Sequence, residues 1–212
     1  VVYLAIRFIG LPNGNFATEK HPQITEDIVN RFADHGYDPE LGWIRKANTS
    51  KLDSGCPYVI DEQGSRKGYQ EKFSNTLIST YGDSYAFCRE CADNETWQYY
   101  LGDSLKTRVL NFGVGNYGFD QSLIRLRREY ERNSTPLVVI GVVPQTIARI
   151  LSVWKHFNEH GNILAFKPRF KVVDGKLVLL KNPVDSLDKY YQLDTFMDEV
   201  RENDYFYANR FI

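Results

Sequence analysis

The sequence predicts an α/β domain built on a parallel β-sheet, because stretches typical of strands and helices alternate over residues 76–161. The run PLVVIGVV at residues 136–143 lacks polar alternation, which is typical of a parallel strand buried on both faces. A length of 212 residues is enough for one such domain with a hydrophobic core. The net charge of −1 gives no sign of a nucleic-acid or anionic-lipid surface, so we expect no nucleic-acid partner.

The first twelve residues, VVYLAIRFIGLP, are apolar except for Arg7 and end at Pro12. Twelve residues are too few to span a bilayer, which requires about 20. Two interpretations stay open. Residues 1–12 are either the end of a membrane anchor or signal segment that begins upstream of Val1, or an ordinary buried strand or helix.

Residues 13–75 are rich in turn-forming residues, as in NGN, HGYDPELGW, DSG and DEQGSRKG. Gly, Pro, Asn and Asp favour turns over regular elements. We therefore expect an irregular N-terminal layer with short strands, such as one at residues 57–60.

Residues 76–161 are predicted to form the α/β core. The β-branched segment TLIST at 76–80 predicts a strand, and the turn YGDS leads from it into a helix over 85–101. The helix over 119–132 is expected to face Ile124 toward the core and Arg125 toward water. The other expected elements are a strand at 107–112, a glycine turn at 113–118, a strand at 136–143 and a helix over 145–160.

Residues 162–212 break this alternation and are expected to be an insertion or lid. The pair Asp174–Gly175 separates two β-rich runs, which is a strong signal for a β-hairpin. A helix over 186–201 is expected to begin with Ser186 as its N-cap.

The tripeptide Gly-Asp-Ser occurs twice, ending at Ser84 and at Ser104. Ser84 follows an apolar strand and opens a helix, which places it at the carboxyl edge of the sheet, where open α/β sheets bind ligands. Ser104 lies between a helix end and the next strand, and Gly102 there is expected to be a helix C-cap. Ser84 is therefore the candidate nucleophile.

Several sequence blocks around Ser84 occur in the order that is typical of the SGNH (GDSL) family of serine hydrolases, which the sequence resembles over about residues 37–150. LISTYGDSYAFC resembles the nucleophile block, VLNFGVGNYGFDQ the second block, and PLVVIGVVPQTI stands in place of the third. The stretch from YDPELGWIRKANTS to YVIDEQGSRKG is similar to the lead-in of many bacterial members. The resemblance implies a flavodoxin-like three-layer α/β/α fold and the activity of an esterase, lipase or carbohydrate acyltransferase. It also implies that the apolar opening is the end of a membrane anchor and that the protein is extracytoplasmic, in the periplasm. A cytoplasmic location is the alternative.

Carried over by position, the resemblance implies that Ser84 is the catalytic nucleophile and that its own N–H is one oxyanion donor. Asn116 stands in the place of the second donor, through its backbone N–H. The family's third donor is an Asn side chain; no Asn stands there, so Gln145 is the candidate. Removing one such donor typically costs about 3–4 kcal/mol of transition-state stabilisation. No cofactor or metal is implied, and the substrate is a small acyl ester such as an acylated carbohydrate.

The family's C-terminal Asp-x-x-His block has no counterpart in this chain. A serine hydroxyl is a weak nucleophile without a neighbouring base. Two hypotheses therefore stay open. In the first, the base lies beyond Ile212 in a longer protein and the domain is an acyl-ester hydrolase or acyltransferase. In the second, the domain is catalytically inactive and serves as a structural or binding subunit of a membrane-associated complex.

Three further motifs have functional and structural interpretations. GVGNYG at 113–118 matches the dinucleotide pattern G-x-G-x-x-G, but a tight turn under an active site is favoured because the acidic residue expected about 20 positions later is missing. His156 and His160 match the inverted zinc-protease pattern H-x-x-E-H. The structural alternative is that both lie in the last turn of a helix, where a positive charge complements the helix dipole. Cys88 and Cys91 form a C-x-x-C, for which buried thiols are favoured over redox or zinc chemistry.

Overall fold

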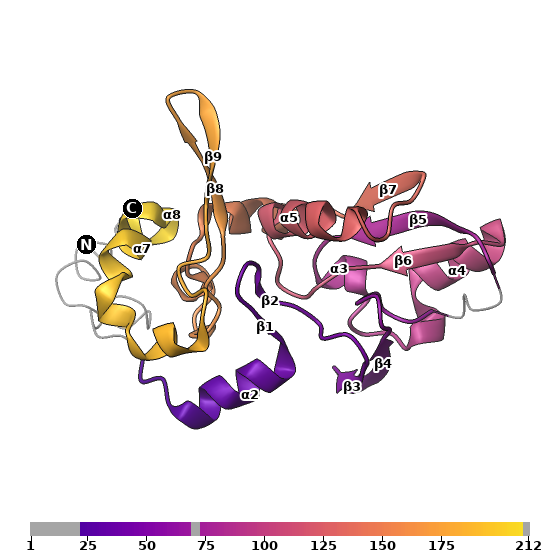
Figure 1. The fold of residues 1–212 in the computed structure, drawn as a ribbon, viewed down its shortest axis with the longest axis horizontal. Helices are drawn as coiled ribbons and strands as arrows, with labels where there is room; N and C mark the ends of the chain where they lie inside the picture. The colour runs from indigo at the N-terminus through magenta and orange to yellow at the C-terminus, as the bar shows by residue number, and fades with distance from the viewer. Residues whose placement is uncertain (1–21, 69–72, 210–212) are drawn as a thin grey trace, which may run out of the picture. The chain divides into compact units, whose positions relative to one another are not determined.

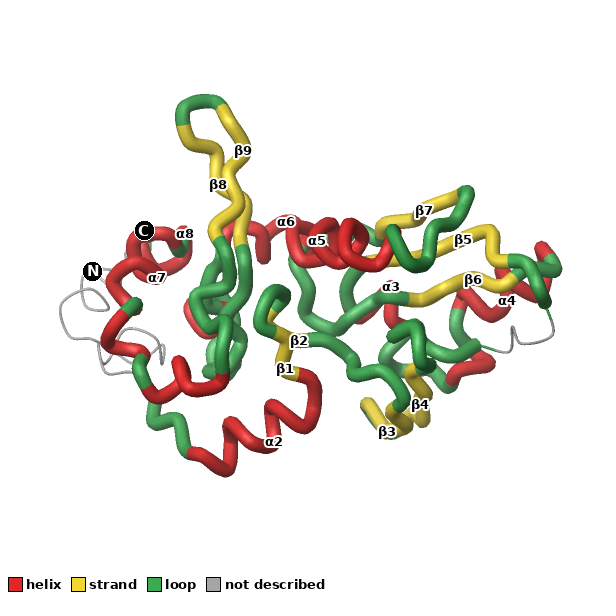
Figure 2. The backbone as a smooth tube through the Cα atoms, in the orientation of Figure 1, coloured by secondary structure: helices red, strands yellow, loops and turns green. Residues whose placement is uncertain are grey.

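The computed structural model describes residues 22–68 and 73–209 (Figures 1 and 2). Its contacts divide the chain into two compact units. The central unit is Ile44–Ile150, and the terminal unit combines Val1–Trp43 with Leu151–Ile212. Each unit is described by itself. The sequence-based boundaries at residues 12, 75 and 161 remain predictions.

The central unit contains a three-stranded parallel sheet with the order β6-β5-β7, so the chain is an α/β protein as predicted. The strands are β5 (Thr76–Tyr81), β6 (Arg108–Asn111) and β7 (Leu137–Ile140). The TLIST segment forms the middle strand, in which Thr80 pairs with Asn111 on one side and Val139 on the other.

The expectation that residues 136–143 are buried on both faces is wrong. β7 is an edge strand, and Leu137 is 53% exposed. Its apolar side chains therefore resemble those of a buried parallel strand in sequence but not in environment.

The predicted helix over 85–101 is broken into two helices, α3 (Ser84–Phe87) and α4 (Trp97–Leu105). Cys88 ends α3 in a left-handed conformation, with φ of 60°, and its N–H donates to the Ser84 carbonyl. Thr96 then caps α4 by accepting from the Tyr99 N–H at 3.1 Å. Gly102 lies within α4, and the C-cap is Lys106, which corrects the prediction for the second Gly-Asp-Ser.

Helix α5 (Phe119–Tyr130) lies where the sequence predicts it, but Arg125 is buried and does not face water. Its Nη1 donates to the Phe112 carbonyl at 2.7 Å, and its Nη2 donates to the Gly64 carbonyl at 2.9 Å. The guanidinium therefore ties α5 to the end of β6, and the two carbonyls supply partners for Nη1 and Nη2 of this buried charge.

The predicted helix over 145–160 also breaks. It begins as α6 (Pro144–Ala148), passes through a 3-10 turn at Arg149–Leu151, and resumes as another 3-10 turn at Lys155–Phe157. Between these turns, the N–H groups of Val153 and Trp154 donate to the Asp204 carboxylate at 2.7 and 3.1 Å. The backbone therefore uses a distant carboxylate in place of helical acceptors.

The terminal unit has an aromatic-rich core in which Trp154 stacks on Phe166 with 5.0 Å between ring centroids. Helix α2 packs its partly buried side chains against this core, and Thr25 caps its N-terminus. The helices and strands of the unit are α2 (Glu26–Gly36), β1 (Tyr37–Asp38), β2 (Gly42–Trp43), β8 (Arg169–Val173), β9 (Lys176–Leu180), α7 (Met197–Asn203) and α8 (Tyr205–Ala208).

Two hairpins close through pairs of residues with positive φ, the geometry of type I′ turns. The predicted β8–β9 hairpin turns at Asp174 and Gly175, with φ of 49° and 74°. In the central unit, β3 (Thr49–Asp53) and β4 (Cys56–Ile60) turn at Ser54 and Gly55, which confirms the strand expected at 57–60.

The helix expected over 186–201 is only partly formed. Ser186 precedes two 3-10 turns, Leu187–Tyr191 and Leu193–Thr195, and it makes no side-chain capping bond to them. Only α7 at the end of this segment is α-helical.

Within residues 22–68 and 73–209, no helix is long and apolar enough to cross a membrane. The segment 1–12, for which an anchor is one interpretation, lies outside the described residues.

Candidate functional site

Ser84 stands at the carboxyl end of the middle strand, where β5 passes through Gly82 and Asp83 into α3. Its side chain is half-buried, and neither its hydroxyl nor its N–H takes part in a hydrogen bond with the described part of the chain. A Cβ on Gly82 would lie 2.7 Å from the Ala86 Cβ and 3.0 Å from the Gly141 carbonyl oxygen. Only glycine therefore allows this close turn between strand and helix.

Asp83 is buried and fixes the turn that presents Ser84. Its Oδ1 accepts from the Tyr85 N–H at 2.9 Å, which caps α3. Its Oδ2 pairs with Arg149 Nη1 at 3.3 Å, and the same nitrogen donates to the Tyr117 carbonyl at 3.4 Å. Arg149 thereby connects the turn at residues 82–84, the loop after β6 and the segment after β7.

The loop after β6 lies against the turn at residues 82–84. The Val114 N–H donates to the Gly82 carbonyl at 3.0 Å, and Gly113 approaches α3 so closely that a Cβ there would lie 2.4 Å from the Phe87 nitrogen. Asn116, with φ of 69°, is half-buried in this loop. Its N–H is also unpaired among the described residues, the state that an oxyanion donor requires.

Two of the three glycines of GVGNYG at 113–118, Gly113 and Gly118, have packing roles, which agree with the tight-turn interpretation. Gly113 meets α3, and a Cβ on Gly118 would lie 2.4 Å from Asp120 Oδ1 and 3.2 Å from the Arg149 Cβ. Gly118 also caps α5, where its N–H donates to Gln121 Oε1 at 3.0 Å.

Gln145 lies in the first turn of α6, after the end of β7, and its residue is exposed. Ser84, Asn116 and Gln145 therefore follow the carboxyl ends of the three adjacent strands β5, β6 and β7. Because the carboxyl ends of parallel strands share one edge, all three predicted residues lie at the same edge of the sheet.

A cavity of about 420 Å³ opens beside α3, and of the three predicted residues only Ser84 lines it. The other lining residues are Tyr85, Cys88, Arg89, Glu90 and Cys91. Burial raises the pKa of the Cys88 thiol, which keeps the sulfur protonated and argues against a thiolate nucleophile. Among the residues that line this cavity, Glu90 supplies the carboxylate that shares it with Ser84.

Sequence reasoning missed Arg66, which holds the far end of α3. Its Nη1 donates to the Phe87 and Cys88 carbonyls at 2.8 and 2.7 Å, and its Nη2 donates to the Cys91 carbonyl at 2.5 Å. Its Nε donates to Asp93 Oδ1 at 2.6 Å, which completes the partners of a buried guanidinium. No local motif marks Arg66, because all the hydrogen-bond acceptors of its guanidinium lie more than 20 residues away.

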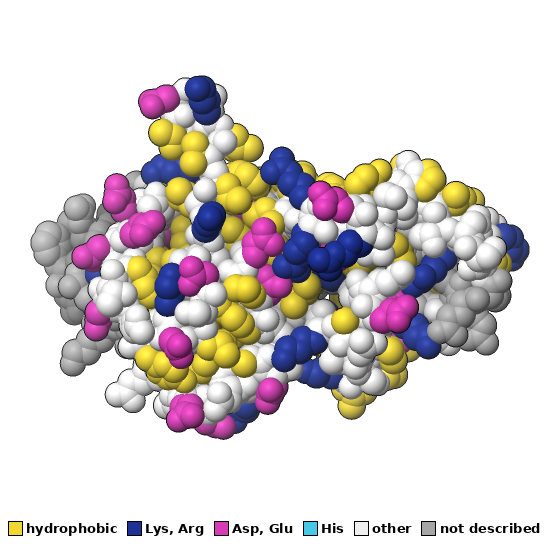
Figure 3. Space-filling view, viewed as in Figure 1, with side chains coloured by type: hydrophobic (Ala, Val, Ile, Leu, Met, Phe, Trp, Pro, Cys, Tyr) yellow, Lys and Arg dark blue, Asp and Glu magenta, His cyan; other side chains and the backbone are white. Residues whose placement is uncertain are grey.

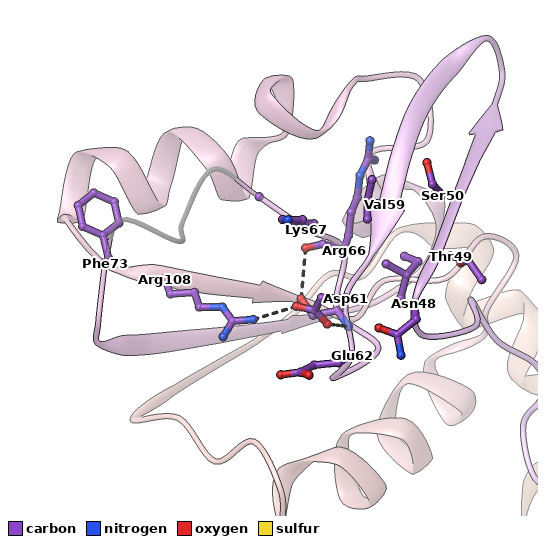
Figure 4. A pocket seen from close by; sticks show the side chains of 13 residues that line it. Asn48, Thr49, Ser50, Val59, Asp61, Glu62, Arg66, Lys67, Phe73 and Arg108 are labelled. Atoms are coloured by element: carbon purple, nitrogen blue, oxygen red, sulfur yellow. Dashed lines mark hydrogen bonds and ion pairs between the residues drawn. The ribbon is translucent and has the colours of Figure 1, made fainter.

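A second cavity, of about 670 Å³, is lined by residues of the β3–β4 hairpin, the segment after β4 and the start of β6 (Figure 4). Arg108 Nη2 pairs with Asp61 Oδ2 at 2.8 Å, and Phe73 and Asn48 lie on opposite sides of this pair. This cavity and the one beside α3 have no lining residue in common. The sequence contains no motif that predicts it.

His156 and His160 belong to the terminal unit, in and just after a 3-10 turn, and not to a regular helix. Their ring centroids are 4.6 Å apart, and His156 also stacks on Trp154. No three His, Cys, Asp or Glu side chains in the part of the chain that the structure describes are grouped so as to hold a metal ion.

Acidification is expected to destabilise the terminal unit through His156. Burial and the nearby His160 lower the pKa of His156 from its ordinary 6.5, and its Nδ1 accepts a hydrogen bond from the Gly161 N–H at 3.2 Å. The unfolded chain therefore binds this proton more readily, so stability is present above pH 6.5 and is lost as the pH falls below it.

Thermal unfolding followed by tryptophan fluorescence between pH 5.5 and 7.5 measures this dependence. His156→Gln should reduce the slope of the melting temperature with pH. His35→Gln, which alters an exposed histidine of the same unit, should leave this slope unchanged. Equal slopes in wild type and His156→Gln would contradict the assignment.

Compared with known proteins, the sequence matches no family model and no curated protein. The function is therefore inferred from the residues and geometry of the molecule.

Proposed function

We propose that the chain carries the nucleophile of a serine ester hydrolase or acyltransferase of the SGNH type, with Ser84 forming an acyl-enzyme. The supporting observation is that the N–H groups of Ser84 and Asn116 and the Ser84 hydroxyl are unpaired among the described residues, in two loops that follow adjacent strands at the carboxyl edge of the sheet. Developing negative charge on a carbonyl oxygen is stabilised by such preorganised donors. The finer fold, a flavodoxin-like three-layer sandwich, is part of the same proposal.

In this mechanism the Ser84 oxygen attacks the ester carbonyl and its proton passes to a base. The alcohol then leaves with a proton, and water or an acceptor hydroxyl releases the acyl group. Ser84 and Asn116 would donate through their N–H groups to the oxyanion, and Gln145 would supply its side-chain amide as a third donor. The substrate class we propose is a small acyl ester, including acylated carbohydrates, in an extracytoplasmic setting.

A specific observation supports a second function, that of an inactive domain acting as a structural or binding subunit of a membrane-associated complex. The central unit, residues 44–150, has no histidine in its sequence. A histidine base would have to come from outside this unit, and a serine hydroxyl without a neighbouring base is a weak nucleophile.

Labelling with a fluorophosphonate probe separates the two functions, because the probe reacts with an activated serine. We expect labelling of the wild type and its loss in Ser84→Ala. The turnover of p-nitrophenyl acetate should fall by at least about 10³-fold in the same variant. Ser104→Ala is the matched control, since it alters the same tripeptide at an exposed position in α4.

Labelling that persists in Ser84→Ala would exclude Ser84 as the nucleophile. A folded wild-type protein that remains unlabelled would favour the inactive subunit.

A further inference from the structure

The hairpin of β8 and β9 has one face made only of apolar side chains. Cross-strand partners share a face, and faces alternate along each strand. Val172 pairs with Leu177 and Phe170 pairs with Leu179, which gives the apolar face. The other pairs form a mixed, basic face, in which Lys171 pairs with Val178. The remaining pairs of the basic face are Arg169 with Leu180 and Val173 with Lys176.

The basic face is the one that the protein itself holds. Lys171 Nζ donates to Asn203 Oδ1 at 3.0 Å, and Arg169 donates to the Asn203 carbonyl, so the base of this face is tied to the end of α7. Val172 and Leu177 on the apolar face are 67% and 63% exposed. Figure 3 shows hydrophobic side chains gathered along the hairpin.

The hairpin also concentrates positive charge. Residues 169–181 contain four basic side chains and one acidic side chain, a net charge of +3, whereas the whole chain has −1. The basic residues are Arg169, Lys171, Lys176 and Lys181, and the acidic residue is Asp174. An apolar face backed by a basic face is the pattern of the amphipathic helices that lie in the plane of a membrane interface, and this hairpin has the same division of faces.

We propose that the β8–β9 hairpin is a binding site for an anionic lipid surface. Its apolar face lies at the boundary of headgroups and acyl chains, and the exposed Lys176 beside the turn lies among the acidic headgroups. An isolated two-stranded hairpin is marginal in water, so a lipid surface supplies the apolar contact that Val172 and Leu177 lack within the described chain. This inference does not rest on the proposed chemistry of Ser84.

The size of the face favours a lipid surface over a second copy of the chain. Two paired strands of five residues cover only about 17 Å by 10 Å, whereas a stable protein interface buries about 800 Å² on each partner. Lipids accept a small apolar footprint because the basic side chains add electrostatic attraction over about a Debye length.

Flotation with vesicles tests the proposal. Wild-type protein should float with vesicles containing phosphatidylglycerol, less so with phosphatidylcholine alone, and binding should fall as salt is added. Leu177→Asp should weaken binding by about tenfold or more, because it places a charge on the apolar face. Leu52→Asp is the matched control, since Leu52 is 71% exposed in the other hairpin, β3–β4, and binding should be unchanged.

Charge reversal tests the electrostatic part. Lys176→Glu should reduce the preference for phosphatidylglycerol, and Lys46→Glu, also at an exposed position, should not. Equal vesicle binding by Leu177→Asp and wild type would overturn the proposal, whatever other segment then binds lipid. It would equally be overturned if wild type stayed off the vesicles and instead formed dimers that Leu177→Asp abolishes, since the face would then bind a second copy.

Discussion

Replacing Arg66 with alanine is expected to lower the free energy of unfolding by about 3–5 kcal/mol, because it removes one partner of a buried ionic network. The Arg66 guanidinium is buried, pairs with Asp93, and donates hydrogen bonds to three carbonyl oxygens at the end of α3 and in the turn that follows. It also lies 4.7 Å from the centroid of the Phe87 ring, and the Arg45 guanidinium lies at the same distance from that centroid. Without it, the carbonyls and the Asp93 carboxylate lose their buried donors.

The effect on Asp93 has a definite sign. Burial already raises the pKa of Asp93, and the hydrogen bond and charge of Arg66 oppose that rise. Removing Arg66 should therefore raise the pKa of this carboxyl further. Urea unfolding at pH 7 followed by circular dichroism measures the stability change, with Arg89→Ala as the control, since that side chain is 43% exposed. A loss below about 1 kcal/mol in Arg66→Ala would contradict the assigned role.

Replacing Gly113 with alanine should be nearly as damaging, at about 3 kcal/mol or more, because overpacking against backbone cannot be relieved by a side-chain rotation. The new Cβ would lie 2.4 Å from the Phe87 nitrogen and 2.7 Å from the Ala86 carbonyl carbon. Both atoms belong to α3, so the clash would push this helix, which begins with Ser84, away from the loop that holds Asn116. Fluorophosphonate labelling of Ser84 should fall together with stability.

Gly141→Ala is the matched control for this prediction. Gly141 follows β7 as Gly113 follows β6, but its Cβ would meet the Ala86 Cβ and the Tyr81 oxygen at 3.5 and 3.6 Å, which are ordinary contacts. Neither glycine has a positive φ, so conformational strain does not separate them. Gly141→Ala should change stability by less than about 1 kcal/mol, and an equal loss in both variants would contradict the steric argument.

The sequence predicts those elements whose causes are local. TLIST is β-branched and apolar, and Asp174–Gly175 suits the positive φ of its turn, so β5 and the β8–β9 hairpin are found where they are expected. The position of Ser84 at the carboxyl edge follows from the strand that precedes it. These features need no knowledge of distant residues.

Features that depend on distant partners could not be predicted in this way. Arg125 falls at a position that helical periodicity assigns to water, yet carbonyls of Phe112 and Gly64 give it a buried place. The left-handed turn at Cys88 could not be predicted, because the sequence has no glycine at this position to indicate a positive φ. The overall charge of −1 likewise hides the +3 of residues 169–181, because a sum over the chain loses its distribution.

The terminal unit is made of two stretches that are far apart in the sequence, so its parts are synthesised at different times. Val29 of α2 belongs to one core with Met197 and Val200, so it leaves the ribosome roughly 170 residues, or about ten to thirty seconds, before those partners exist. The contacts of the central unit all fall within one continuous stretch that is complete by Ile150. Translation that stops between the two stretches leaves Val29 as a hydrophobic side chain without its core, a natural target for chaperones.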